Sequence, residues 1–423
     1  MKKVFRSEAM RLGLFICIGG IVGWLLLLIA YLLPTGPMEK NVLAASEELS
    51  QLGPNPMLLP NNTATRLDIY TDTIMLNEAV YTGNEGILEK TVAAYRYSYK
   101  DQTPFQSLLA YLSGKEGSER VEYARYWHGY LIFLKPLLFW GSYDDIKALN
   151  LLVQMFLSAV IVIEMAKRKM EHFIVCFLLG IYSLMPIATV MCFQYATVQN
   201  ITLISCAVLL KYYERLVQKG LIPFFYVSVG MAVCYFDLLT YPLVTLGFAC
   251  LVHITLEEKG QSVKKCVGNI VGRSIFWALG YVGIWGMKWI LASIFMKKNI
   301  IKEGILQVLY RSSLDASEIG VTDEISRMKA LLLNIKTIVT PSLLIAVGIC
   351  LFIVLARYIS RRKWVLNVSQ MISRIVIAIM PFIWVVITAN HSYIHYWMVY
   401  REFSITVFAV ACIMASLICD EDS

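Results

Sequence analysis

Leu12–Leu33 reads LGLFICIGGIVGWLLLLIAYLL and contains no charged side chain. The run provides the roughly 20 apolar residues that an α-helix needs to cross a bilayer. It exceeds the apolar core of a cleaved signal peptide, about 7–15 residues, so we expect an uncleaved membrane anchor. The small residues of VLAAS, Val42–Ser46, keep a cleaved leader open as the alternative.

The composition of the whole chain agrees with a membrane protein. Of its 423 residues 58% are hydrophobic and 16% are charged, whereas soluble domains have roughly 25% charged residues. The mean hydropathy is +0.61. We therefore predict an all-α, polytopic membrane bundle of about 10 transmembrane helices. The predicted spans are 12–33, 147–166, 172–190, 199–216, 222–238, 240–256, 275–296, 341–358, 373–390 and 402–419.

Short basic segments fall in alternate predicted loops and indicate the orientation. Lys and Arg are enriched in loops on the cytoplasmic side of a membrane. We therefore expect a multi-pass protein of the cell membrane with both termini in the cytoplasm. The net charge of +8 is then mainly a topology signal, and the dispersion of the basic residues argues against nucleic-acid binding. The basic segments are 1–6, 167–169, 211–219, 257–265 and 357–363.

This orientation divides the chain into three parts. Residues 1–33 form the cytoplasmic tail and first transmembrane helix, 34–146 a long outer loop, and 147–423 the remaining bundle with a second outer loop near 297–340. The first loop is rich in aromatic residues, so it should form interfacial helices that roof a cavity rather than stay disordered. Its segment 126–140 is short for a span and suits an interfacial or re-entrant element.

Two acids in LDIYTDTIML, Asp68 and Asp72, form the first candidate site. At positions i and i+4 of a helix their carboxylates share one face, where like charges repel each other. A cation or a substrate hydroxyl beside them would relieve this repulsion. The polar face of a surface helix is the structural alternative.

Cationic and aromatic residues alternate in RYWHGY, where Trp127 and His128 follow Arg125. Arg and His bind phosphate oxygens, and aromatic faces suit a sugar ring or the bilayer interface. An aromatic belt with snorkelling cations is the alternative. Arg311, in LYRSS of the second outer loop, is a weaker candidate for the same anion site, with a solvated loop charge as its alternative.

Two further candidates lie at expected outer helix ends. Asp237, in YFDLLTYP, either lines a cavity or caps a hairpin turn. NHSYIHYWMVYR contains His391 and His395 four residues apart and includes Arg401 at its end. The pair lacks the Glu of an HExxH zinc motif. A phosphate-binding cluster therefore ranks above a zinc site, and a hydrogen-bonded helix end is the structural alternative.

Several motifs are absent from the sequence. It has no Walker A motif, dinucleotide fingerprint, GxSxG or CxxC, so we do not expect ATP hydrolysis or use of nucleotide sugars by a soluble domain. Its 10 cysteines lie in or beside apolar runs and suggest free, packed thiols. The predicted spans carry few charges, which argues against an ion channel or a proton-coupled transporter.

The layout of the chain resembles the GT-C class of integral-membrane glycosyltransferases. The shared features are an uncleaved first helix, a long outer loop with an early acidic motif, and hairpins with Arg and His at the outer mouth. Four segments resemble signature blocks of a GT-C-like group of multi-pass proteins from Gram-positive bacteria: YTDTIML, ARYWHGYLIFLKPLL, YFDLLTYP and NHSYIHYWMVYR.

The resemblance implies transfer of a sugar from a polyprenyl-phosphate-linked donor to a saccharide, lipid or protein acceptor on the outer face, in cell-envelope assembly. An acid of the first outer loop acts as base or orients the acceptor in this class, and Asp72 matches it first, Asp68 second. The expected phosphate ligands are cationic: Arg125, His128, His395 and Arg401.

One departure from the class pattern is that the acids lie well beyond the first helix instead of directly after it. This leaves both the identity of the base and a divalent metal requirement open. A non-catalytic flippase or transporter of lipid-linked saccharide is the main alternative function, and a membrane scaffold in envelope assembly is the third.

Overall fold

The computed structural model describes residues 2–257, 260–322, 325–361 and 367–416. The described chain is helical apart from its loops and one antiparallel sheet, in which β1 (Arg96–Ser98) pairs with β2 (Glu119–Val121). The predicted all-α class is therefore confirmed, although this small sheet in the first loop was not foreseen. The α-helices are α1 (Lys2–Tyr31), α2 (Gly36–Leu52), α3 (Ile69–Ala79), α4 (Ile87–Ala93), α5 (Pro104–Leu112), α6 (Leu131–Trp140), α7 (Tyr143–Lys167), α8 (Glu171–Ser183), α9 (Pro186–Met191), α10 (Phe193–Gln218), α11 (Ile222–Phe236), α12 (Leu243–Leu256), α13 (Val263–Met296), α14 (Ile300–Arg311), α15 (Arg327–Ile338), α16 (Pro341–Arg361), α17 (Val368–Ile387), α18 (Ala389–Ile394), α19 (Tyr396–Val399) and α20 (Ser404–Ser416); the 3₁₀ turns are η1 (Thr63–Thr65), η2 (Ser317–Ile319) and η3 (Tyr400–Phe403).

Six helical segments of the described chain are long and apolar enough to cross a membrane, and α15 with α16, bent by 72°, gives a seventh if the pair is one span. The apolar helices α8, α11 and α12 coincide with three more predicted spans but have only 13, 15 and 14 residues. Such helices rise about 20 Å, less than the ~30 Å hydrocarbon core. The larger predicted number of spans therefore stays a prediction. The last residues of the predicted span 402–419 lie outside the described chain.

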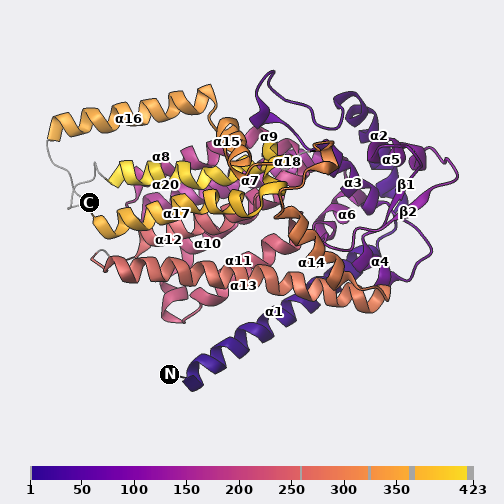
Figure 1. Ribbon diagram of the computed structural model, residues 1–423, viewed down its shortest axis with the longest axis horizontal. Helices are drawn as coiled ribbons and strands as arrows, with labels where there is room; N and C mark the ends of the chain where they lie inside the picture. The colour runs from indigo at the N-terminus through magenta and orange to yellow at the C-terminus, as the bar shows by residue number, and fades with distance from the viewer. Residues whose placement is uncertain (1, 258–259, 323–324, 362–366, 417–423) are drawn as a thin grey trace.

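The helices of the bundle run along the long axis of the molecule, and the folded first loop covers one end (Figure 1). The first turn of α1 and the last turn of α20 both lie toward the opposite end of the molecule. The end that carries the first loop is called the outer end below, after the predicted orientation, which stays a prediction.

Close helix packing in the bundle depends on two glycines. A Cβ atom on Gly230 of α11 would lie 2.0 Å from the Trp277 carbonyl oxygen, and one on Gly280 of α13 would lie 2.1 Å from the Val227 carbonyl oxygen. Neither distance is compatible with a side chain. Small residues at such positions let membrane helices approach closely and gain van der Waals contact.

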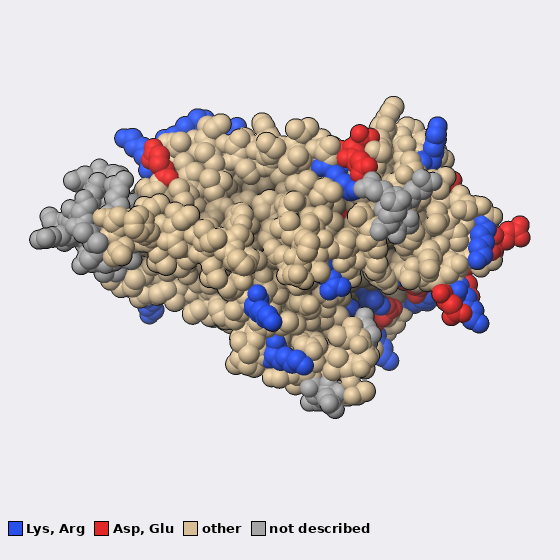
Figure 2. Space-filling model, turned by 90° about the horizontal axis from the view of Figure 1, so that it is seen from above, with Lys and Arg blue, Asp and Glu red and all other residues tan. Residues whose placement is uncertain are grey.

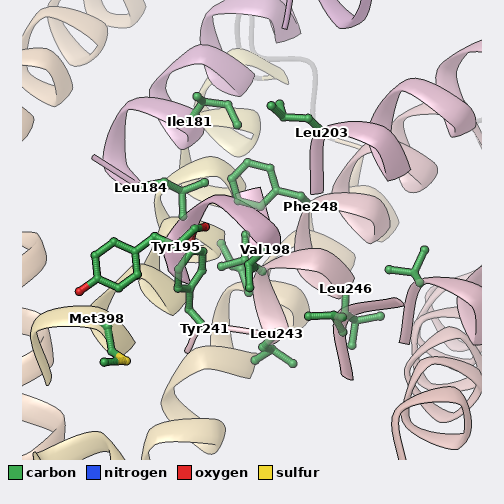
Figure 3. Close-up of a cluster of buried hydrophobic side chains, with 14 of the residues drawn as sticks. Ile181, Leu184, Tyr195, Val198, Leu203, Tyr241, Leu243, Leu246, Phe248 and Met398 are labelled. Carbon is green, nitrogen blue, oxygen red and sulfur yellow. The ribbon is translucent and has the colours of Figure 1, made fainter. Parts of the chain in front are cut away.

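One part of the bundle core is formed by aromatic and aliphatic side chains from α8, α10 and α12 (Figure 3), and the core continues into α11, α13, α17 and α20. Tyr195 and Tyr241 pack edge to face, with ring centroids 6.3 Å apart, at the outer end of this core. The Tyr241 hydroxyl donates a hydrogen bond to the Tyr195 carbonyl oxygen at 2.5 Å. Such an internal partner is needed because no water is available to a polar group at membrane depth.

The surface of the bundle is apolar. On the face in Figure 2, charged side chains gather toward the two ends, and few interrupt the surface between them. Large apolar side chains on α7 point outward, with Leu152 64% and Phe156 68% exposed. A soluble protein rarely exposes so much contiguous apolar surface, and these faces suit the hydrocarbon of a bilayer.

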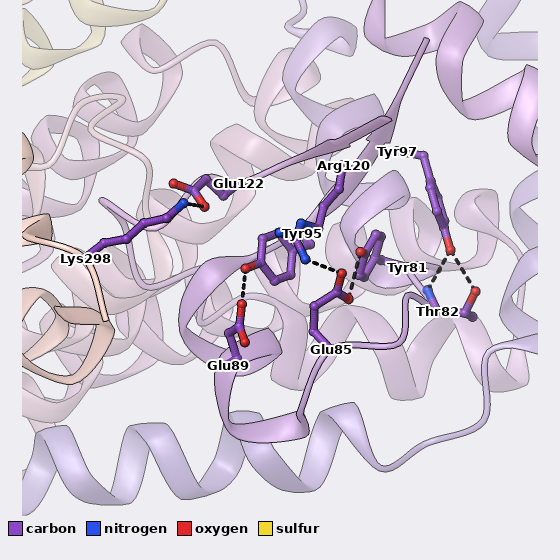
Figure 4. Close-up of polar contacts among 9 residues, drawn as sticks. All are labelled: Tyr81, Thr82, Glu85, Glu89, Tyr95, Tyr97, Arg120, Glu122 and Lys298. Atoms are coloured by element: carbon purple, nitrogen blue, oxygen red, sulfur yellow. Dashed lines mark hydrogen bonds and ion pairs between the residues drawn. The ribbon is translucent and has the colours of Figure 1, made fainter. Parts of the chain in front are cut away.

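The first loop is a folded unit tied together by polar contacts at its surface (Figure 4). Arg120 of β2 forms an ion pair with Glu85 at 2.5 Å, and Tyr95 donates to Glu89 at the same distance. Lys298, after α13, pairs with Glu122 at 2.6 Å. The Arg120–Glu85 and Lys298–Glu122 pairs join segments far apart in the sequence, as expected for a folded cover rather than a linker.

Candidate functional site

Helix α3 and the residue before it carry three buried acids at the outer end: Asp68, Asp72 and Glu78. Asp68 caps the helix, accepting hydrogen bonds from the Thr71 backbone N (3.1 Å) and the Thr71 hydroxyl (2.7 Å). Burial raises the pKa of Asp68, and the bonds from Thr71 oppose this rise. Asp68 thus performs the capping role that Asp favours at this position.

Asp72 is bound to the start of α10. Its carboxylate accepts hydrogen bonds from the backbone N atoms of Phe193 and Gln194, both at 2.8 Å, and from the Cys192 thiol at 3.6 Å. The Tyr143 hydroxyl donates to it as well. Burial raises the pKa of Asp72 to about 6. A carboxylate has about four lone-pair sites, so this one has none free for a substrate, and it clamps α3 to the positive end of α10.

Arg401 is fully buried and binds backbone carbonyls. Its Nε donates to Leu184 O and its Nη1 to Trp397 O, both at 3.0 Å, and its Nη2 donates to Ala64 O at 3.4 Å. The guanidinium lies 4.1 Å from the centre of the Tyr195 ring. In this position Arg401 joins the first loop to the bundle, and the described contacts do not connect it to Asp72.

Arg125 and Trp127 attach the first loop to α13 and α14. The Arg125 Nη1 pairs with Glu303 at 2.9 Å, and both groups are partly exposed. The Trp127 indole donates to the Ile284 carbonyl oxygen at 2.7 Å. The Arg125 guanidinium is the more accessible of the predicted phosphate ligands.

His391 and His395 face each other, with ring centroids 4.9 Å apart. The His391 Nε2 lies 2.7 Å from the Leu239 carbonyl oxygen, which can only accept, so this nitrogen carries the proton and Nδ1 is bare. Burial and then the Arg311 charge lower the pKa of His391 to about 3; burial and then His391 lower the pKa of His395 well below its ordinary value. Both imidazoles are neutral near pH 7 and lack the positive charge that we expected for phosphate binding.

Asp237 holds the turn between α11 and α12. Its carboxylate accepts from the backbone N of Thr240 at 2.8 Å and from the Thr240 hydroxyl at 2.5 Å. Burial raises the pKa of Asp237 to about 7. The same turn presents the Leu239 carbonyl to His391, and Arg311 contacts the neighbouring Asn390 at 3.4 Å. Three predicted candidates therefore meet here: Asp237, Arg311 and His391.

The predicted candidate His128 belongs to a polar cluster with two residues that the sequence analysis missed, Glu78 and Tyr130. The Tyr130 hydroxyl donates to Glu78 Oε2 at 2.5 Å, and the His128 Nδ1 lies 3.0 Å from the same oxygen and 2.8 Å from the hydroxyl. All three side chains are buried. The signal in the sequence was a Glu inside the apolar run TIMLNEAV, where an unpaired charge would be costly.

The loop before α6 has an unusual backbone that positions this cluster. His128 adopts a positive φ of 55°, which few residues other than glycine favour. The Gly129 backbone N donates to the Tyr235 carbonyl oxygen at 2.9 Å, and a Cβ on Gly129 would lie 2.2 Å from the Tyr235 ring. The sequence HG is thus needed for the loop to turn against α11 and point His128 at Glu78.

An apolar groove of about 890 Å³ lies between α6, α7, α10 and α11. Its wall includes Tyr130 and Phe193 at the outer end of these helices, and the polar side chains of Asn150 and Asn200 farther along. The Asn200 amide donates to Asn150 Oδ1 at 3.0 Å. None of the ten predicted site residues is among the described residues that line the groove. Two lining residues contact the acids of α3: the Tyr130 hydroxyl donates to Glu78, and the Phe193 backbone N donates to Asp72.

Metal ligands do not converge in the part of the chain that the structure describes: it contains no group of three or more His, Cys, Asp or Glu side chains that could hold an ion. The described cysteines are free thiols. Comparisons with protein-family models, with curated proteins and with solved structures found no match for this chain.

Proposed function

We propose that this protein is a membrane glycosyltransferase that moves a sugar from a polyprenyl-phosphate-linked donor to an acceptor at the outer face. The proposal includes a GT-C-like bundle with about ten spans, in which α8, α11, α12 and the bent α15–α16 pair also cross the membrane. Both termini would lie in the cytoplasm, at the end opposite the first loop.

The apolar groove carries this proposal. Its volume of about 890 Å³ falls within the 300–1,000 Å³ typical of ligand pockets. Its walls come from helices that suit the membrane, and its outer end reaches Tyr130, beside a buried acid. A polyprenyl chain in the groove would stay in apolar contact while its phosphate remained at the helix ends.

A non-catalytic carrier of lipid-linked saccharide is the second candidate function. One observation favours it: the acids that the resemblance offers as base, Asp72 and Asp68, are occupied by hydrogen bonds within the fold. A carrier needs the groove but no base.

Photocrosslinking tests the groove directly. Purified protein in lipid nanodiscs would be irradiated with a photoreactive polyprenyl phosphate, and cross-linked peptides would be identified by mass spectrometry. We expect cross-links on α7, α10 and α11. Val153→Trp, which fills the groove, should abolish them, whereas Leu152→Trp on the exposed face should not. Cross-links spread over the outer surface of the bundle would contradict the proposal.

An assay of sugar transfer distinguishes the glycosyltransferase from the non-catalytic carrier. The protein would be incubated with lipid-linked saccharides extracted from membranes of the producing cells. A glycosyltransferase should release polyprenyl phosphate together with a glycosylated product, and mass spectrometry detects both whichever sugar is transferred. Binding in the groove without release would favour the carrier.

A further inference from the structure

We propose that Glu78, His128 and Tyr130 form a proton relay that opens on the groove, with Tyr130 as the residue that meets the substrate. The inference rests on the proposed function for its substrate, an acceptor hydroxyl beside a lipid-linked sugar. The contacts among the three side chains carry it.

The first step is the position of the protons. The His128 Nε2 lies 2.7 Å from the Tyr123 carbonyl oxygen, which can only accept, so Nε2 carries a proton. The Nδ1 of the same ring lies 3.0 Å from Glu78 Oε2. If neither Nδ1 nor the Glu78 oxygen carried a proton, two hydrogen-bond acceptors would lie in contact with each other. The cluster therefore holds one proton beyond that of the Tyr130 hydroxyl.

The second step assigns this extra proton. Glu78 Oε2 lies 2.5 Å from the Tyr130 oxygen and thus receives two donors if His128 is an imidazolium. Hydrogen-bond donors stabilise a carboxylate, so the proposed relay places the proton on His128 Nδ1 and makes Glu78 the acceptor of both side chains.

The third step is the open side of Glu78. Its Oε1 is buried and has no hydrogen-bond partner among the described residues, whereas the carboxylate of Asp72 is fully occupied. Tyr31 of α1 and Tyr123 of the loop also lie within electrostatic range of Glu78, and no described contact has either of them donating to it. The Glu78 Oε1 therefore has no donor among the described residues.

The fourth step connects the relay to the groove. Tyr130 belongs to the groove wall and donates its hydroxyl proton to Glu78. Because its side chain is buried, a substrate in the groove must displace neighbouring side chains to reach the hydroxyl. In the proposed transfer, the acceptor oxygen bonds to the anomeric carbon, and the bond from that carbon to the phosphate oxygen breaks with its electron pair on the phosphate. The acceptor proton passes to the Tyr130 oxygen as the Tyr130 proton moves to Glu78. This is general base catalysis through one intervening hydroxyl.

Nitrogen NMR of the full chain in nanodiscs tests the relay, and the five histidines make the spectrum tractable. The His128 signals would be assigned by His128→Gln. We expect protonated shifts for both His128 nitrogens, and a change in them when polyprenyl phosphate is added. Tyr130→Phe should abolish that response. The matched control Tyr143→Phe, which removes the hydroxyl bound to Asp72, should retain it.

The outcomes distinguish the relay from the proposed function. If the photoreactive probe cross-links to the groove but His128 does not respond to lipid, the relay is wrong and the proposed function stands. A bare Nδ1 on His128 also overturns the relay. If the probe does not cross-link to the groove, the proposed function fails, and the Nδ1 signal still decides whether the cluster holds the extra proton.

Discussion

Asp72 and Glu78 lie on the same helix, are 1% and 0% exposed, and each contacts a residue of the groove wall. Asp72 binds the backbone N of Phe193, and Glu78 accepts from the hydroxyl of Tyr130. The two carboxylates differ in how many of their oxygen lone pairs accept hydrogen bonds. Those of Asp72 are occupied by the start of α10, and one oxygen of Glu78 is open.

This difference suggests different roles for Asp72 and Glu78. Buried acids at a helix start gain from the positive end of the helix dipole and need no further partner. A buried carboxylate oxygen without a partner is costly to the fold, and such a cost is often accepted at a functional site. Asp72 therefore supports the fold, and Glu78 is the acid that the proposed function would use for its chemistry.

The largest expected effect is on transfer. Glu78→Gln keeps an oxygen for Tyr130 and His128, and its new amide group occupies the side that has no donor. The shape of the contact is kept, but the proton acceptor and the charge that faces His128 are lost. Release of polyprenyl phosphate should fall by roughly 10²–10⁴-fold. A Glu78→Gln protein that transfers sugar at the wild-type rate would show that Glu78 is not the base.

The second effect is on stability. In Asp72→Asn, the amide donor must face one of the donors from Phe193, Gln194 or Tyr143. We expect a loss of about 2–3 kcal/mol, measured by thermal or chemical unfolding in detergent. An Asp72→Asn protein as stable as the wild type would show that Asp72 does not clamp α3 to α10.

The sequence predicted the class of fold well, because runs of apolar residues and alternating basic loops are local signals of membrane helices. It could not establish whether α8, α11 and α12 cross the membrane, since helices of 13 to 15 residues are short for a full span. Their status depends on packing against longer neighbours and on local bilayer thickness.

The candidate site was less predictable, because residue type does not reveal which lone pairs remain free. Asp68 and Asp72 have suitable chemistry, but hydrogen bonds across more than 100 residues of sequence occupy Asp72. Glu78 was not predicted because a single Glu in an apolar run has no motif. The His391 and His395 pair was expected to be cationic, and burial keeps both neutral.

The third effect compares the two hydroxyls that serve the acids. Tyr143→Phe removes a donor from Asp72, which still keeps both backbone donors, and Tyr130→Phe removes a donor from Glu78, which keeps His128. Each should cost about 1–1.5 kcal/mol of stability. Only Tyr130→Phe should slow transfer. If Tyr143→Phe slows transfer equally, Asp72 belongs to the reaction after all.

The smallest effect is the pH dependence of stability due to Asp72. Burial raises its pKa from 3.8 to about 6 in the folded protein, so the folded state binds the proton more tightly than the unfolded state. The stability that this proton provides is present below pH 3.8 and is lost as pH rises toward 6.

Comparison with Asp72→Asn isolates this contribution, because Asn does not titrate and other buried acids are shared by both proteins. The free energy of unfolding of both proteins would be measured by chemical unfolding at several pH values. The difference in favour of the wild type should shrink between pH 4 and 6. An advantage that grows with pH would mean that the donors of α10 outweigh burial and hold the Asp72 pKa below its ordinary value. Asp72 would then be an even stronger clamp, and its contrast with Glu78 would widen.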